Sequence, residues 1–171
     1  MDFFEVLEKR RSIRKYKDEK VEDEKLLKIL NAANSAPSAG NLQAYEIFLV
    51  RDKRKKHLLA RASFDQHFIE EADVVLIFCA NPSRSSKYYG RRGERLYCLQ
   101  DATIAASYAQ LAATALGLGS VWVGAFDDEK VLEIINAPKS LIPIAIIPIG
   151  YPDENPRKRE RRKLEDLVHE I

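Results

Sequence analysis

Two stretches of the chain gather positive charge, and the residue types of the first suit a bound phosphate. The first places three arginines and one hydroxyl within five residues, at Arg10, Arg11, Ser12 and Arg14. Guanidinium groups match the oxygens of a phosphate and make charge-assisted hydrogen bonds, each worth about 1.5–3 kcal/mol. The second stretch is the basic run at residues 157–163. The alternative for the first stretch is a solvated basic helix end that interacts with the helix dipole.

A loop of small and amide-bearing residues lies at residues 37–43, with the sequence Pro-Ser-Ala-Gly-Asn-Leu-Gln. Asn41 and Gln43 each offer a hydrogen-bond donor and an acceptor, which suits the edge of a heteroaromatic ring. The alternative is a plain turn between a helix and a strand. Taken alone, this loop favours the plain turn.

The sequence carries no conventional catalytic or metal-binding motif. The three histidines stand alone, and no Gly-x-Ser-x-Gly sequence offers a hydrolase nucleophile. Gly117, Gly119 and Gly124 have the wrong spacing for a dinucleotide-binding fingerprint and follow a predicted helix. Cys79 and Cys98 are too far apart for a Cys-x-x-Cys pair, so we interpret both as buried apolar side chains.

Composition limits the class of protein. The 171 residues are 46% hydrophobic and 32% charged, and the net charge is only +2. This length fits one domain, and the small net charge argues against a nucleic-acid partner. The longest apolar stretch, residues 96–118, contains Gln100, Asp101 and Gln110, which a membrane span would tolerate poorly. With no signal peptide at the N-terminus, we expect a cytoplasmic protein that binds neither nucleic acid nor membrane.

Hydrophobic spacing predicts a mixture of helices and strands. Helical spacing of apolar residues predicts helices at residues 3–10, 22–35, 53–62, 65–71, 94–116 and 127–135. Short apolar runs predict strands at residues 45–50, 74–80, 120–123 and 142–149. Because helices and strands do not alternate strictly, an α+β fold around a mixed sheet fits best.

Two segments leave alternatives open. The longest predicted helix repeats alanines along one face, which suits either a central core helix or a helix at a subunit interface. Residues 81–93 are predicted to form a polar loop that carries Tyr88, Tyr89, Arg91 and Arg92. These four side chains either shape a substrate pocket or simply face solvent.

Combined with residues 120–127 and 150–152, these segments resemble the nitroreductase family of FMN enzymes. The first of the added segments reads Ser-Val-Trp-Val-Gly-Ala-Phe-Asp, and the second is Gly-Tyr-Pro, followed by Arg159-Glu160-Arg161. The resemblance covers essentially the whole chain, in order and at matching spacing. It implies a short single-domain form, residues 1–171, with a mixed central sheet flanked by helices in an intertwined homodimer. Residues of about 152–171 are then expected to reach the partner subunit.

The resemblance also implies which residues bind FMN. Those on the phosphate, ribityl chain and one side of the ring are Arg10, Arg11, Ser12 and Arg14, with Arg159 and Arg161 completing the phosphate site. Those that reach the flavin from the other subunit are Pro37, Ser38, Ala39, Asn41 and Gln43. Gly124 and Ala125 match the backbone that lies against the reactive edge of the flavin.

The implied activity is an oxidoreductase reaction with ping-pong kinetics. NADH or NADPH donates electrons, and a nitroaromatic, a quinone or a similar small molecule accepts them at the same site. The flavin carries the chemistry, so no catalytic side chain and no metal are expected. The alternatives are another flavin redox task, such as dehalogenation or dehydrogenation, and a flavin-binding protein with little turnover.

Overall fold

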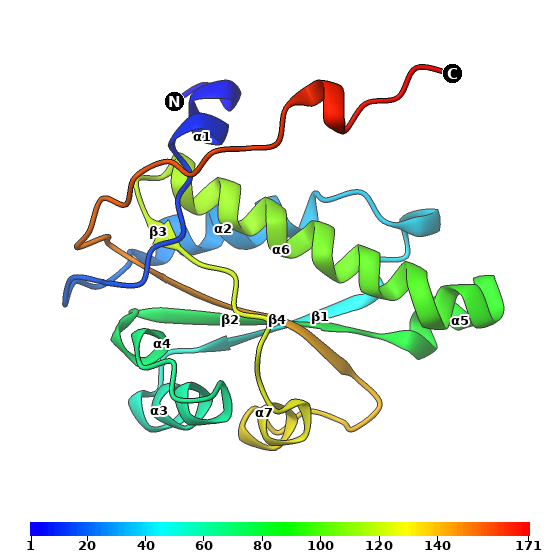
Figure 1. The fold of residues 1–171 in the computed structure, drawn as a ribbon. Helices are drawn as coiled ribbons and strands as arrows, with labels where there is room; N and C mark the ends of the chain where they lie inside the picture. Colours follow the sequence, from blue (N-terminus) through cyan, green and yellow to red (C-terminus); the bar gives the residue numbers. More distant parts are fainter.

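A computed structural model describes residues 1–171 and places a four-stranded sheet between two layers of helices (Figure 1). The strands are β1 (Tyr45–Val50), β2 (Val74–Ala80), β3 (Gly119–Ser120) and β4 (Ile142–Gly150), in the spatial order β1-β2-β4-β3. Every ladder between these strands is antiparallel. The four-stranded sheet is therefore antiparallel, and the one parallel pairing is an isolated bridge outside the strands, between Ser12 and Ser120. The predicted α+β class is confirmed.

Helices cover both faces of the sheet. The helices of the chain are α1 (Phe3–Lys9), α2 (Asp23–Asn34), α3 (Lys53–Ala62), α4 (Phe68–Glu71), α5 (Pro82–Arg92), α6 (Cys98–Ala115) and α7 (Asp128–Ile134). Single turns of 3₁₀ helix lie at Ala39–Asn41 and Leu164–Asp166, and a π turn lies at Gly93–Tyr97. Helices α2 and α6 pack on one face, and α3, α4 and α7 on the other (Figure 1). None of the helices combines the length and apolar character needed to cross a membrane.

Strand β2 is the centre of the core because all its residues are buried. Side chains alternate between the two faces of a strand. Leu76 and Phe78 therefore join the cluster beneath α2 and α6, whereas Ile77 and Cys79 join the cluster beneath α3 and α7. Burial raises the pKa of Cys79 to about 12, so its thiol stays protonated. Cys98 is also buried, which confirms the interpretation of both cysteines.

Most alanines of α6 belong to the core of the subunit. Five of its seven alanines pack on α2 and the sheet and are fully buried, whereas Ala112 is partly buried and Ala115 is exposed; the buried ones are Ala102, Ala105, Ala106, Ala109 and Ala113. Small side chains let the helix approach its neighbours closely. Of the two alternatives for this face, the core helix is the one observed.

The predicted polar loop at residues 81–93 is wrong, because most of it forms helix α5. Asn81 accepts a hydrogen bond from the Arg84 amide at 3.2 Å, and Pro82 takes the first helical position. Asparagine at the N-cap followed by proline is a favourable helix start. Most polar side chains of α5 face solvent, with Ser85 buried, and the helix lacks the apolar spacing by which the other helices were predicted.

Three predicted boundaries also shift. The helix expected at 65–71 shortens to α4, because Phe64 and Asp65 have φ values of 57° and 59°. The long helix expected from 94 begins as α-helix at Cys98, after the π turn. The strand expected at 120–123 pairs only at Gly119–Ser120 and then through one bridge from Val123 to Ile146.

Gly93 marks the closest approach between α5 and the π turn that follows it. A Cβ built on Gly93 would lie 2.6 Å from the carbonyl oxygen of Ser85, a backbone atom that cannot rotate away. Gly93 has φ −60° and ψ −47°, so alanine would suffer no dihedral strain there. The need for glycine at this position is therefore steric.

We expect Gly93→Ala to destabilise the fold by about 1–3 kcal/mol, the usual cost of overpacking. Each kcal/mol lowers Tm by about 2–4 °C in a domain of this size. Thermal unfolding followed by circular dichroism measures the effect. Lys87→Ala, on the exposed surface of the same helix, is the control and should leave Tm nearly unchanged. Equal Tm values for Gly93→Ala and wild type would contradict the steric argument.

Candidate functional site

The N-terminal arginine segment is extended because α1 ends just before it. A capping box fixes the helix start, since Asp2 accepts from the Glu5 amide at 2.9 Å and Glu5 accepts from the Asp2 amide at 3.0 Å. Arg10 at the other end has φ −56° and ψ 125°, which are not helical. The chain then runs beside β3, where the Ile13 amide donates to Ser120 at 3.0 Å. Residues 10–14 thus lie along the edge of the sheet.

Backbone pairing brings the C-terminal basic run to the same place. The Lys17 amide donates to the Tyr151 carbonyl at 2.9 Å, and the Asp153 amide donates to the Lys15 carbonyl at 2.9 Å. Tyr16 and Pro152 form an antiparallel bridge between these two bonds. The chain that leaves β4 therefore returns along the arginine segment.

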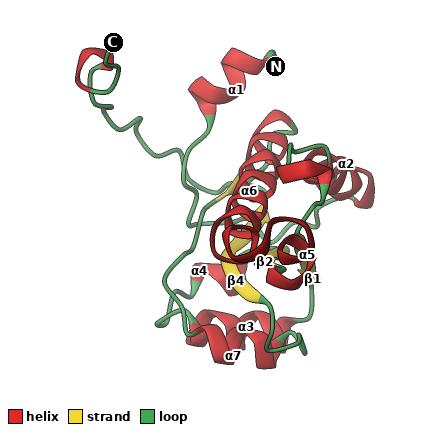
Figure 2. Ribbon diagram, turned by 90° about the vertical axis from the view of Figure 1, so that its right-hand side faces the viewer, coloured by secondary structure: helices red, strands yellow, loops and turns green.

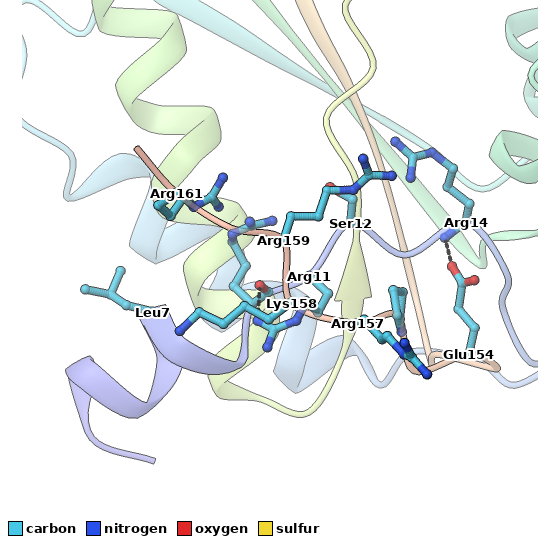
Figure 3. A pocket seen from close by; sticks show the side chains of 11 residues that line it. Leu7, Arg11, Ser12, Arg14, Glu154, Arg157, Lys158, Arg159 and Arg161 are labelled. Carbon is cyan, nitrogen blue, oxygen red and sulfur yellow. Dashed lines mark hydrogen bonds between the residues drawn. The ribbon is translucent and has the colours of Figure 1, made fainter. Parts of the chain in front are cut away.

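The two segments enclose a cavity of about 280 Å³ (Figure 3). Its lining contains a single hydrophobic residue and a large excess of cations. The lining residues are Leu7, Arg10, Arg11, Ser12, Arg14, Glu154, Pro156, Arg157, Lys158, Arg159 and Arg161. The structure thus gathers all six phosphate-site residues expected from the sequence, together with two basic residues, Arg157 and Lys158, that were not assigned to the site.

Charges inside this cavity are only partly balanced. Its one carboxylate, Glu154, accepts a hydrogen bond from the backbone amide of Arg14, and Lys158 pairs with Glu8. Partial burial, followed by the nearby charges of Arg161 and Arg11, lowers the pKa of Arg10. Like charges held this close repel one another, and a bound anion would relieve that repulsion.

Arg11 and Arg14 also have partners within the chain. The Arg11 guanidinium donates to the carbonyls of Glu8 at 2.6 Å and Arg10 at 2.9 Å, at the C-terminal end of α1. Arg11 therefore interacts with the end of a helix, as the alternative from the sequence proposed for this stretch, and it also lines the cavity. The Arg14 guanidinium lies 5.9 Å from the centre of the Phe68 ring, at the edge of the site nearest α4. Arg10, Arg157, Arg159 and Arg161 line the cavity without a side-chain partner in the chain.

The amide loop lies at a second cleft, of about 590 Å³, that shares no residue with the arginine cavity. Pro37, Ser38 and Ala39 line this cleft together with Asp101 and neighbouring residues of α6. Within one chain, therefore, the structure does not join the loop to the arginines. The expectation that the loop serves the other subunit's flavin is compatible with this separation.

The Gly124–Ala125 segment is exposed and fixed at both ends. Val123 exchanges two 3.0 Å backbone hydrogen bonds with Ile146, and the Asp127 amide donates to Ala62 at 2.9 Å. Between these ends the Gln66 side chain donates to the Ala125 carbonyl at 3.3 Å. The amides of Gly124 and Ala125 donate to no protein acceptor, so they are free to bind a ligand.

Sequence reasoning missed the part played by Asp101, a buried carboxylate on α6 that accepts hydrogen bonds from the amides of Ala39 and Ala44. A possible signal was its position in the sequence, directly before Ala102 on the alanine-rich face. Acidic side chains are almost never fully buried unless they are paired.

No group of three histidine, cysteine, aspartate or glutamate side chains could hold a metal ion.

The structure is thus that of an α+β protein with a cavity lined mainly by basic side chains. The sequence profile of the nitroreductase family matches residues 7–69 and 55–151. The chain is 34% identical to the NAD(P)H FMN reductase of Bacillus subtilis, over 94% of this chain and 70% of that protein. It is 33% identical to an NADH dehydrogenase of Thermus thermophilus, over 94% and 91% of the two chains.

Solved structures agree with the sequence comparisons. The NADPH:FMN oxidoreductase of Vibrio harveyi, complexed with NAD⁺, superimposes with a TM-score of 0.90 at 29% identity. The match covers 98% of this chain and 76% of that one. The chain therefore belongs to the nitroreductase family.

We expect inorganic phosphate to stabilise the protein when no other ligand is present. At about ten times its dissociation constant, a bound anion adds about 1.4 kcal/mol, which corresponds to a Tm increase of about 3–6 °C. Differential scanning fluorimetry measures the shift, with sodium chloride at matched ionic strength as the control for simple screening. The same shift with both salts would show that the cavity binds no anion specifically.

Proposed function

We propose that this chain is an FMN-dependent oxidoreductase that takes electrons from NADH or NADPH and passes them to a nitroaromatic, a quinone or a similar small acceptor. The observation that carries the proposal is the cationic cavity, in which segments from opposite ends of the chain meet. Relatives support the cofactor, since the Bacillus subtilis protein is named an FMN reductase and the Vibrio harveyi protein an NADPH:FMN oxidoreductase. We place the reaction in the cytoplasm, where NAD(P)H is available.

The donor set of the cavity fits the phosphate of FMN. Arg10, Arg159 and Arg161 offer guanidinium forks, and Ser12 offers a hydroxyl beside them. A phosphate monoester carries about two negative charges, which these cations would balance. Arg14 lines the cavity and lies near Phe68, so it is positioned to contact the part of FMN that leads from the phosphate to the ring.

The Gly124–Ala125 segment would hold the ring edge. Its two amides have no protein acceptor, and anchors at both ends keep the backbone in place. Backbone donors of this kind can hydrogen-bond a ring nitrogen without any side-chain rearrangement. When bound, FMN supplies the transfer of two electrons between donor and acceptor, and the protein contributes orientation and electrostatics.

A homodimer would complete the site. Phe3 and Phe4 are 61% and 77% exposed, and the C-terminal segment exposes Leu164, Leu167 and Val168. Figure 2 shows α1 and this segment standing away from the body of the subunit. Exposed apolar groups of this kind are typical of a subunit interface. We propose that residues of about 152–171 reach the partner, and that Pro37, Ser38, Ala39, Asn41 and Gln43 contact the partner's flavin.

The direct test is the visible spectrum of the purified protein with FMN under nitrogen. We expect a flavin band that bleaches promptly with NADH or NADPH and returns when a quinone or nitroaromatic is added. A flavin band that neither nucleotide bleaches would contradict the proposed reaction and favour a carrier. Failure to bind FMN at all would refute the proposed cofactor.

Removing two cavity arginines should weaken FMN binding. We expect Arg10→Ala combined with Arg161→Ala to raise the Kd for FMN at least about 100-fold, because two charge-assisted hydrogen bonds are lost. Flavin fluorescence titration measures the Kd. Arg54→Ala combined with Arg61→Ala, on α3, changes the net charge equally and should leave the Kd unchanged. Equal affinities in all three proteins would show that the phosphate lies elsewhere.

Shortening the C-terminus should separate the subunits. Deletion of residues 164–171 removes Leu164, Leu167 and Val168 but retains the cavity arginines. We expect a dimer-to-monomer shift in analytical ultracentrifugation, and weaker FMN binding because the proposed site needs both subunits. Glu165→Ser combined with Asp166→Ser is the control on the same segment. A truncated protein that remains dimeric would contradict the role given to this segment.

A further inference from the structure

We infer that Asp101 is a positioning residue that fixes residues 39–44 of the amide loop and the strand entry after it, and through them the proposed site of the partner subunit. This inference rests on the proposed function, and it adds a residue that touches neither cofactor nor substrate. Asp101 lies on α6 and is only 2% exposed. An acidic side chain in this position requires hydrogen-bond partners, because burying an unpaired charge is costly.

Both carboxylate oxygens of Asp101 bind the loop. Oδ1 accepts from the Ala39 amide at 3.0 Å, and Oδ2 accepts from the Ala44 amide at 3.3 Å. These two amides lie at the two ends of the segment that carries Asn41 and Gln43. One rigid helix residue therefore fixes both ends of the loop at once.

The loop needs such an anchor because its backbone is strained. Gly40, Asn41 and Gln43 have φ values of 57°, 55° and 43°. Non-glycine residues in this left-handed region cost energy and persist only where the surroundings enforce them. Two other side chains contact the loop: Ser38 accepts from the Gln43 amide at 3.0 Å within the loop, and the exposed Arg84 donates to the Leu42 carbonyl at 2.5 Å. Only Asp101 is both buried and bound to amides near the two ends of the segment.

The consequence for the flavin is geometric. Asn41 and Gln43 present their amides from the same strained turn, and the Gln43 amide group already donates to Asn41 Oδ1 at 2.6 Å. A loop released at one end would rotate these groups away from the ring edge. Even small displacements of positioned groups cost binding and rate at a site.

The first experiment compares Asp101→Asn with a matched control, Asp73→Asn. Asparagine can accept from only one of the two loop amides and turns its NH₂ group toward the other. Asp73 likewise accepts a backbone amide, that of Val21 at 2.9 Å, but lines neither cavity. We expect the Kd for FMN to rise about tenfold in Asp101→Asn and to stay at the wild-type value in Asp73→Asn, even where both variants lose thermal stability.

A second variant removes the same hydrogen bond from the other side. Ala39→Pro deletes the donor amide at the first position of a 3₁₀ turn, after an extended Ser38, where proline is tolerated. Because α6 is untouched, we expect this variant to keep the fold of the subunit, which thermal unfolding followed by circular dichroism checks. We expect a similar loss of FMN affinity, and an effect of the double variant smaller than the product of the two single effects.

Mixed dimers show on which subunit Asp101 acts. Asp101→Asn chains keep the arginine cavity, whereas chains with Arg10→Ala and Arg161→Ala keep the loop. A dimer of one chain of each kind therefore contains one intact site and should bind one FMN with wild-type affinity. A stability defect alone would not be complemented in this way.

Unchanged FMN affinity in both Asp101→Asn and Ala39→Pro, or no recovery in the mixed dimer, would overturn the inference and leave the proposed function intact. Failure of the wild-type protein to bind FMN would overturn the proposed function and this inference with it.

Discussion

Backbone hydrogen bonds between residues 15–17 and 151–153 hold together two segments that repel each other. The segments carry most of the cations of the arginine cavity, which has only one carboxylate in its lining. Each hydrogen bond contributes a net gain of about 0.5–1.5 kcal/mol. These bonds hold the two segments together against a repulsion that water and salt partly screen. The energy needed to gather these charges is recovered when an anion binds.

The sheet supplies the frame for this pairing. Strands β2 and β4 are almost entirely buried, so their positions are set by packing on both faces. Backbone hydrogen bonds hold both the arginine segment and the Gly124–Ala125 segment on the sheet. They join Ile13 to Ser120 and Val123 to Ile146. A phosphate site and a pair of free amides thus keep a fixed separation, which is what a rigid cofactor with a charged tail requires. The amide loop, in contrast, depends on α6.

The bounds of helices and strands could be predicted from the sequence where burial of apolar side chains determines the element. The continuous apolar run of β2 and the spacing in α3 predicted their bounds, because burial decides those segments. Sequence reasoning missed α5, whose helix depends on a cap at Asn81 and not on an apolar face. It also could not place Asp101 beside Ala39, a contact across 62 positions with no local signature. The meeting of residues 10–14 with 157–161 was expected only through family resemblance, since no periodicity links them.

The central claim is that the arginine cavity holds the phosphate of FMN. Titration of the protein with FMN and with riboflavin tests it most directly, because the two ligands differ only in that phosphate. If two to three charge-assisted hydrogen bonds are made, FMN should bind at least about 100-fold more tightly than riboflavin, and the difference should shrink as salt is added. Equal affinities for the two ligands would contradict the claim.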